Sequence, residues 1–272
     1  MSGYKHILCP LTGASGDAAA LGAALGLGLA FEAEVEVLHP RLDAVAAAPL
    51  VGEGLSGEVI EEVIAVAARE IEARAEAVRT LFETKRGGMK RAPASRFLDI
   101  QLSESDVAHH GRLSDLIVLP RLEGQEAQET AQLFHALLMG AGHPLLMIPP
   151  GGAKPVGRRV AVAWNGSAEA ARAVTAARPF LERAEAVFVL TAGSHGAPEG
   201  LITHLARHGV KASSATVREG DAGAHLLDAA VENGADLLIM GAYTHSRLRQ
   251  LLFGGVTRHV LDHAPIPVLM MH

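Results

Sequence analysis

Short runs of apolar residues alternate along the chain with longer stretches whose apolar positions recur with a helical period. In the second half, the short runs predict strands near 159–164, 186–191, 213–217, 236–240 and 266–270. The stretches between them predict helices near 167–182, 198–208, 221–233 and 254–263. Regular alternation of strands and helices is typical of right-handed βαβ units. The pattern therefore predicts an α/β fold with a parallel sheet covered by helices on both faces.

The helices of this half also carry terminal signals. Ser167 precedes the first helix as a predicted N-cap, and Glu169 follows in the first turn. Gly209 and Gly234 each follow a helical stretch, where glycine commonly ends a helix. These signals locate helix ends independently of the apolar pattern.

The first half follows the same plan with one expansion. An opening strand and turn at 7–13 lead into an Ala- and Leu-rich helix over 18–30. Residues 56–85 show a helical stripe of apolar positions opposite a charged face. We expect a long surface helix packed on its own domain, with a coiled-coil or partner-binding role as the alternative. A third strand near 97–101 has only a weak signal.

The chain contains the same α/β unit twice. The strand 115–119 and the segment 143–149 match 236–240 and 263–270 of the second half. The stretches between these matching strands differ from each other. The repeat therefore predicts an intrachain pseudo-dimer with one candidate ligand site and one degenerate half.

A segment rich in proline and glycine, 149–157, separates the two units and is typical of a linker. We expect two tandem five-stranded parallel-sheet domains on its two sides. The first, 1–150, would carry the long helical insert and the degenerate site. The second, 157–272, would carry a partial nucleotide loop.

Composition narrows the function classes. The 272 residues are 49% hydrophobic and 20% charged, as in a globular protein with a buried core. A formal net charge of −6 argues against a general nucleic-acid binder, which usually has a basic face. The single cysteine, Cys9, excludes an intrachain disulfide and fits a reducing compartment. Neither a signal peptide nor a membrane-spanning apolar run is visible, so we expect a cytoplasmic protein.

Two motifs of the second half resemble the universal stress protein family in its tandem two-domain form. Asp236-Leu-Leu-Ile-Met-Gly241 resembles the family's fourth strand, and His263-Ala-Pro-Ile-Pro-Val-Leu269 resembles its ending. The resemblance covers nearly the whole chain. It implies Rossmann-like, adenine nucleotide α-hydrolase-like domains. It also implies that the protein either binds ATP or AMP at the carboxyl ends of its strands or binds no nucleotide.

In the nucleotide-binding branch, the fourth strand leads into a loop patterned G-x2-G-x9-G-S/T. Gly241 matches the first glycine, Thr244 occupies the second position, and Gly254 matches the third. Gly255 stands where the small hydroxyl residue is expected, and Thr257 lies two residues further on. Such glycines permit close backbone approach, and N–H groups at the start of the next helix bind an anion. The match is therefore partial.

The charge of this loop favours the second half as the nucleotide site. No acidic residue occurs from 241 to 261, while Arg247, Arg249 and Arg258 are present. We place Arg247 or Arg249 near the phosphates, with a solvated helix face as the alternative role. The corresponding first-half segment carries three acidic residues and one arginine: Glu123, Glu126, Glu129 and Arg121.

A second family position lies after the first strand, where an Asp often contacts adenine or ribose. Thr12 aligns there in the first half and Asn165 in the second. Asn165 still offers an amide donor and acceptor to a nucleotide, although it lacks a carboxylate. Trp164 beside it either stacks on a ring or fills the core.

The remaining chemistry-bearing residues do not form an enzyme site. His204 and His208 share a helix face but lack a third ligand, so we expect no metal beyond Mg²⁺ accompanying ATP. Residues 13–17 are not a P-loop, because no Gly-Lys-Ser/Thr follows. We find no convincing pair of acid–base carboxylates. The sequence therefore supports at most slow ATP hydrolysis.

Two hypotheses follow. The first is a stress-response regulatory protein that binds an adenine nucleotide through Asn165, Gly241 and the loop to Thr257. The second is a scaffold without nucleotide that acts through a protein partner. Under the second hypothesis the halves pair through their last strands, near 144–148 and 266–270, because an edge strand needs a partner. A homodimer of whole chains is a further expectation, and an enzyme of the wider group is the weakest alternative.

Overall fold

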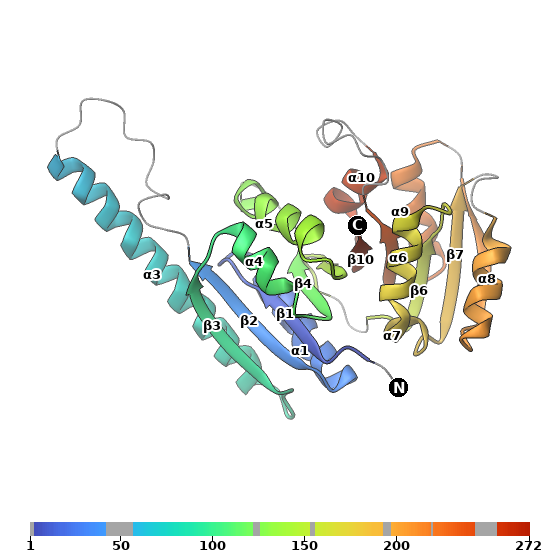
Figure 1. Ribbon diagram of the computed structural model, residues 1–272, viewed down its shortest axis with the longest axis horizontal. Coiled ribbons are helices and arrows are strands. Elements are labelled where there is room, and N and C mark those ends of the chain that lie inside the picture. The colour runs from blue at the N-terminus through green and yellow to red at the C-terminus, as the bar shows by residue number, and fades with distance from the viewer. Residues whose placement is uncertain are drawn as a thin grey trace.

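The computed structural model describes residues 3–41, 57–121, 126–152, 156–192, 197–218, 220–242 and 255–272. Within these ranges all strands belong to one continuous ten-stranded sheet, in the order β3-β2-β1-β4-β5-β10-β9-β6-β7-β8 (Figure 1). The first five strands come from the first half and the last five from the second. Within each half the strands are parallel, as predicted.

Each half alternates strands and helices along the chain. The elements of the first half are β1 (His6–Pro10), α1 (Asp17–Phe31), β2 (Glu34–Arg41), α3 (Gly57–Gly87), β3 (Ser95–Gln101), α4 (Glu104–Gly111), β4 (Leu116–Pro120), α5 (Glu126–Gly140) and β5 (Leu145–Ile148). Those of the second half are β6 (Arg159–Ala163), α6 (Ala168–Ala176), α7 (Arg178–Leu181), β7 (Ala186–Ala192), α8 (Pro198–Arg207), β8 (Ala212–Val217), α9 (Ala222–Glu232), β9 (Leu237–Gly241), α10 (Val256–His263) and β10 (Val268–Met271).

The predicted elements of the second half are confirmed within a few residues, except for the helix expected over 167–182. That helix ends at Ala176, and the short α7 follows from Arg178. Pro179 is the physical reason, because proline has no N–H to donate and restricts the residue before it. The predicted glycine stops are confirmed, since Gly209 and Gly234 have φ of 76° and 66°.

The two halves join through their last strands. β5 and β10 pair antiparallel, with Met147 opposite Val268 and Leu145 opposite Met270. This pairing confirms the predicted contact between the two final strands. All four of these side chains are almost completely buried. Neither strand therefore remains as an exposed edge within the molecule.

Helices cover both faces of the shared sheet. One core lies under α1, α3, α6, α7 and α8, and the other lies under α4, α5, α9 and α10. Both cores contain side chains from both halves. The lone Cys9 belongs to the first core, where complete burial raises the pKa of its thiol, so it is a core residue as expected. No helix within the described ranges combines the length and apolar character needed to cross a bilayer.

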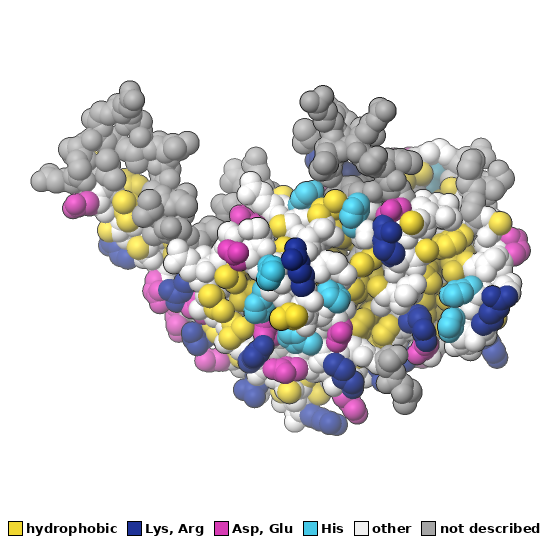
Figure 2. All heavy atoms as spheres, in the orientation of Figure 1, with side chains coloured by type: hydrophobic (Ala, Val, Ile, Leu, Met, Phe, Trp, Pro, Cys, Tyr) yellow, Lys and Arg dark blue, Asp and Glu magenta, His cyan; other side chains and the backbone are white. Residues whose placement is uncertain are grey.

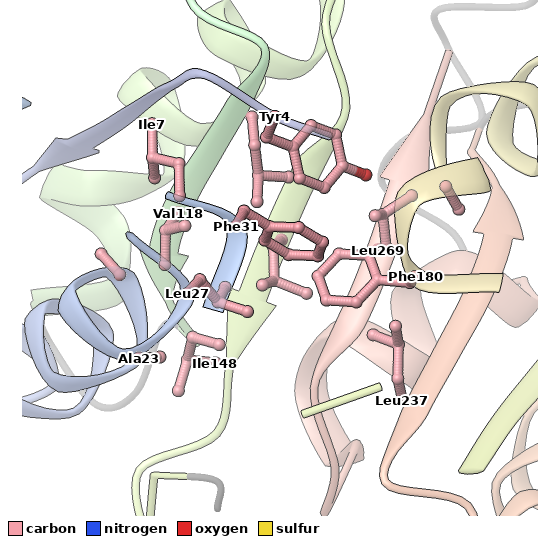
Figure 3. Close-up of a cluster of buried hydrophobic side chains, with 14 of the residues drawn as sticks. Tyr4, Ile7, Ala23, Leu27, Phe31, Val118, Ile148, Phe180, Leu237 and Leu269 are labelled. Carbon is pink, nitrogen blue, oxygen red and sulfur yellow. The ribbon is translucent and has the colours of Figure 1, made fainter. Parts of the chain in front are cut away.

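An aromatic cluster lies where the first core crosses from one half to the other (Figure 3). The Tyr4 and Phe31 rings meet edge to face at 5.1 Å, and Phe180 packs against both at 5.6 and 5.2 Å. The Tyr4 hydroxyl donates to the Ala176 carbonyl at 2.8 Å. The Arg183 guanidinium lies over the Phe31 ring at 4.7 Å. The halves thus share buried side chains as well as strand pairing.

The Asp that opens the repeated fourth-strand motif has a structural role in both halves. Asp115 accepts hydrogen bonds from the backbone N–H groups of Lys5 and His6 at 2.7 and 2.9 Å. Asp236 accepts in the same way from Gly157 and Arg159 at 2.8 and 3.1 Å. Each carboxylate therefore fixes the start of the first strand of its half beside the fourth.

The long helix predicted over 56–85 is confirmed as α3, which extends from the sheet at the left of Figure 1. Its later part packs on its own domain, where Val78 and Phe82 are buried and Phe82 stacks on Phe97 at 5.8 Å. In its earlier part, Val59 and Val66 are exposed. The helix therefore packs on its own domain through its later part, and a partner-binding role stays a prediction.

A buried ion network stabilises the first half at the amino ends of its strands, under α4. Figure 2 shows histidine side chains gathered over this part of the molecule. The Glu36 carboxylate is fully buried and contacts the side chains of His6, His110 and Arg96. Burial would raise the pKa of Glu36, but these three partners outweigh it and lower the pKa to about 2. The Glu36 contact also raises the pKa of His6.

The matching positions of the second half hold different chemistry. By strand register, Phe188 replaces Glu36 and Arg159 replaces His6. The Arg159 guanidinium lies 5.1 Å from the Phe188 ring centroid. A cation–π contact therefore replaces the buried carboxylate network at this place.

We predict that Glu36→Gln destabilises the protein, with a dependence on pH. The pKa of Glu36 falls from 4.5 to about 2 on folding, which corresponds to about 3 kcal/mol. That stabilisation is present above the unfolded pKa and is lost as the pH falls towards 2. The His6 stabilisation is present below 6.5 and is lost as the pH rises through its raised pKa.

Urea unfolding from pH 2 to pH 9 measures the difference in the free energy of unfolding between wild type and Glu36→Gln. The gap between wild type and Glu36→Gln should be largest at about pH 4.5 to 6.5 and should shrink on both sides. The matched control is Glu185→Gln, which removes an exposed ion pair to Arg158 and should cost under about 1 kcal/mol. A gap that does not vary with pH would contradict the network's role.

Candidate functional site

The candidate site lies where the strand order of the second half reverses direction. β6 and β9 are neighbours there, although four helices, α6 to α9, separate them along the chain. The connections that leave their carboxyl ends lead to helices on opposite faces, which opens a crevice between them. Asn165 follows β6 and Gly241 ends β9 at this crevice, and α10 begins further along the chain.

Asn165 supports the turn that leads into α6. Its side-chain oxygen accepts from the Ser167 backbone N–H at 3.1 Å, and the Ser167 hydroxyl accepts from the Ala170 N–H at 3.2 Å. The predicted N-cap is thereby confirmed. Asn165 itself is exposed, and its amide nitrogen is the group that it can offer a ligand. Trp164 packs against the first core, so core filling is its role here.

Gly241 has a packing role that its place in the loop motif did not reveal. A Cβ atom at this position would lie 2.6 Å from the Ala170 nitrogen and 2.7 Å from the Glu169 carbonyl carbon. Both are backbone atoms of the first turn of α6. Only glycine therefore lets α6 lie against the end of β9. The first half reverses this arrangement, because a Cβ added at Gly16, before α1, would lie 2.5 Å from the Cβ of Pro120 in β4.

Gly255 begins α10 in a conformation that favours glycine. Its φ of 139° lies outside the region that other residues readily adopt, while no atom of the described residues lies within 4 Å of an added Cβ. This backbone explains why glycine stands where the motif has a small hydroxyl residue. Thr257 is half-buried in the first turn of α10. Side chains cap α6 and α9, through Ser167 and Asp221, but none of the described residues caps α10.

The other predicted loop residues, Thr244, Arg247, Arg249 and Gly254, lie outside the described residues. Arg258 is described and lies 3.4 Å from Asp262, one turn further along α10. Arg258 is therefore part of a solvated helix face, which was the alternative role for the arginines.

The sequence analysis did not assign two residues of α6, Glu169 and Arg172, to the site. Glu169 lies beside Gly241, and Arg172 contacts Glu169. Arg172 donates to the Glu169 carboxylate at 2.7 Å and to the His272 carbonyl at 3.0 Å. The pKa of Glu169 is lowered, chiefly by a hydrogen bond from its own backbone N–H and then by Arg172. The signal available in the sequence was that Glu169 is an acidic residue in the first turn of the helix that follows the first strand of this half. The crevice therefore contains the Glu169 carboxylate, although the sequence from 241 to 261 has no acidic residue.

In the first half, the equivalent turn is held by its own carboxylate. Asp17 is 1% exposed and accepts from the Gly13 N–H at 2.7 Å. Arg121, which follows β4, donates to the Ala264 carbonyl of the second half at 2.8 Å. The backbone donor and the arginine of this edge thus have protein partners, which disfavours a phosphate there.

The second half of the chain matches a known protein family in sequence. The sequence model of the universal stress protein family matches residues 197–272. This segment contains α8 to β10 and therefore the predicted loop. Residues 197–272 therefore form a universal stress protein domain. The match falls in the second half, where the two diagnostic motifs were found.

Individual proteins resemble the chain over a short segment of sequence or in fold. The universal stress protein Slr1230 of Synechocystis sp. is 53% identical over 38 residues, which are 14% of this chain and 13% of that protein. A universal stress protein from Archaeoglobus fulgidus superposes with a TM-score of 0.67 at 13% identity, covering 98% of this chain and 95% of its own. A functionally unknown protein from Pseudomonas aeruginosa gives 0.55 at 15%, covering 98% and 92%. These structures share the fold over both halves.

We predict that Gly241→Ala destabilises the protein by about 1–3 kcal/mol, because the new methyl group meets helix backbone that cannot rotate away. The matched control is Gly26→Ala in α1, where nothing lies within 4 Å of the added Cβ. It should be neutral or stabilising by about 0.5–1 kcal/mol. Urea unfolding of both variants measures the difference. Equal stability of the two variants would show that α6 does not depend on the glycine.

Proposed function

We propose that this protein is a universal stress protein, a stress-response regulator that binds an adenine nucleotide, ATP or AMP, in its second half. Binding would alter a surface at this crevice that a protein partner recognises. The proposal places the nucleotide in the crevice between β6 and β9. It assigns no catalytic residue.

The observation that carries the proposal is that no described side chain caps the start of α10. The first N–H groups of a helix lack partners within the helix and attract an anion. Ser167 and Asp221 satisfy such groups in α6 and α9, but no side chain of the described residues does so in α10. Within the described part of the chain, no atom lies within 4 Å of a Cβ added at Gly255. A phosphate could therefore accept from these N–H groups, and Thr257 could donate its hydroxyl.

The turn between β1 and α1 of the first half disfavours a second nucleotide site. Its β1–α1 turn is closed by Asp17, whose charge would repel a phosphate. We therefore propose one nucleotide per chain, with Mg²⁺ accompanying ATP. Asn165 would contact the base or ribose through its amide, in place of the carboxylate that the family often has.

The β5–β10 pairing favours a second candidate, a scaffold that acts through protein partners without a nucleotide. This contact supplies a reason for the duplication that needs no ligand, since it buries two strands that would otherwise be edges. The Glu169 carboxylate beside Gly241 also counts against a highly charged triphosphate.

Calorimetric titration of ATP and of AMP, each with and without Mg²⁺, tests the proposal on protein first checked for carried-over nucleotide. We expect one equivalent per chain. Two equivalents would overturn the degenerate first half. Neither heat nor carried-over nucleotide would overturn nucleotide binding and favour the scaffold.

A paired substitution locates the site. Thr257→Val should weaken binding about tenfold, because it removes one hydrogen bond to a charged group and keeps the shape. Thr175→Val is the matched control, since Thr175 is exposed on α6 and its hydroxyl donates to the Ala171 carbonyl. The control should bind as wild type does. Equal affinity of both variants would move the nucleotide away from α10.

A further inference from the structure

A cavity of about 70 Å³ lies in the first half, away from the proposed nucleotide site. It is found at the carboxyl ends of β1 and β2, between α3, α4 and α5. A buried water needs about 10–15 Å³ of such space, and an apolar cavity of about 150 Å³ holds benzene. This cavity is therefore large for one water and too small for an aromatic ring. Its lining is Thr12, His39, Pro40, Arg41, Ile71, Arg74, Leu102, Glu104, Val107 and Leu133.

His39 gives the cavity a defined polar group. The residue is 2% exposed, and its Nδ1 lies 2.8 Å from the Leu11 carbonyl oxygen. A carbonyl only accepts, so Nδ1 must carry the hydrogen. In the neutral ring Nε2 is then a hydrogen-bond acceptor. Among the described residues no group bonds to Nε2, and this nitrogen is not sealed from water-sized space. A partner for it would therefore come from the cavity.

The other lining groups favour a neutral guest. Leu102, Val107 and Leu133 form an apolar wall. The Arg41 guanidinium is already bonded to Asp99 at 2.6 and 2.5 Å and to Glu72 at 2.6 Å. The remaining charged groups of the lining, on Arg74 and Glu104, have opposite signs. An anion would meet Glu104, and a cation would meet Arg74.

We propose that this cavity binds a short-chain alcohol. The hydroxyl donates its hydrogen to His39 Nε2, and the hydrocarbon part packs against Leu102, Val107 and Leu133. An alcohol fits because it combines the donor that a neutral imidazole requires with an apolar body smaller than benzene. This site is independent of the nucleotide site, since it lies in the other half and uses none of its residues.

The test compares 2-propanol with acetone, which has the same number of heavy atoms but no hydrogen to donate. Each is titrated into the full chain at about pH 8. The readout is the ring signals of ¹³C-labelled histidine, with His39 assigned by its loss in His39→Phe. We expect saturable shifts of the His39 signals, with 2-propanol binding about tenfold more tightly than acetone.

Two variants locate the binding. Leu133→Phe fills the cavity and should abolish the shifts, whereas Leu113→Phe adds the same atoms at a residue 82% exposed and should leave them unchanged. Three results would overturn the proposal. They are no saturable shift with 2-propanol, equal binding of acetone, or unchanged binding in a folded Leu133→Phe variant. The ligand comparison uses wild-type protein, so it decides the matter even if a variant fails to fold.

Discussion

The antiparallel pairing of β5 with β10 is the interaction on which the rest of the structure depends. Each half has its own parallel sheet, and each sheet would end in an exposed edge strand. Joining the two edges makes one sheet whose cores both cross the junction. The Tyr4, Phe31 and Phe180 rings seal this junction on one face. Because the pairing is antiparallel, the carboxyl ends of the two halves point in opposite directions, and each half has a separate crevice.

Separate crevices allow the two halves to differ in chemistry while they share a fold. In the second half, glycine at the end of β9 admits the first turn of α6, and no side chain of the described residues caps α10. In the first half, glycine lies on the helix side instead, and Asp17 occupies the turn. The same divergence appears at the opposite ends of the strands, where Glu36 corresponds to Phe188. Each solution satisfies its own local contacts, so substitutions in one half need no match in the other.

Much of this fold could be predicted from the sequence, because strands such as β9 and β10 are buried on both faces and appear as continuous apolar runs. The junction could also be predicted, since two matching final strands each need a partner. The break at Pro179 could have been predicted from proline chemistry but was missed.

The roles of single residues could be predicted less well, because they depend on contacts between distant segments. Gly241 matched a phosphate-loop motif, yet its closest contact is the backbone of Ala170. Asp236 appeared as part of a strand motif, but its carboxylate bonds to N–H groups up to 79 residues away. His39 drew no attention in the sequence, because only the fold places it beside a cavity. A pattern along the chain identifies which residues are unusual and does not show which neighbours they meet.

Strand pairing and a shared core make the two halves one folding unit. Scanning calorimetry of the full chain tests it most directly, because a two-state transition has equal calorimetric and van 't Hoff enthalpies. We expect a single transition with a ratio of calorimetric to van 't Hoff enthalpy near one. Two resolved transitions, or a calorimetric enthalpy about twice the van 't Hoff value, would show that each half unfolds alone and would contradict the account.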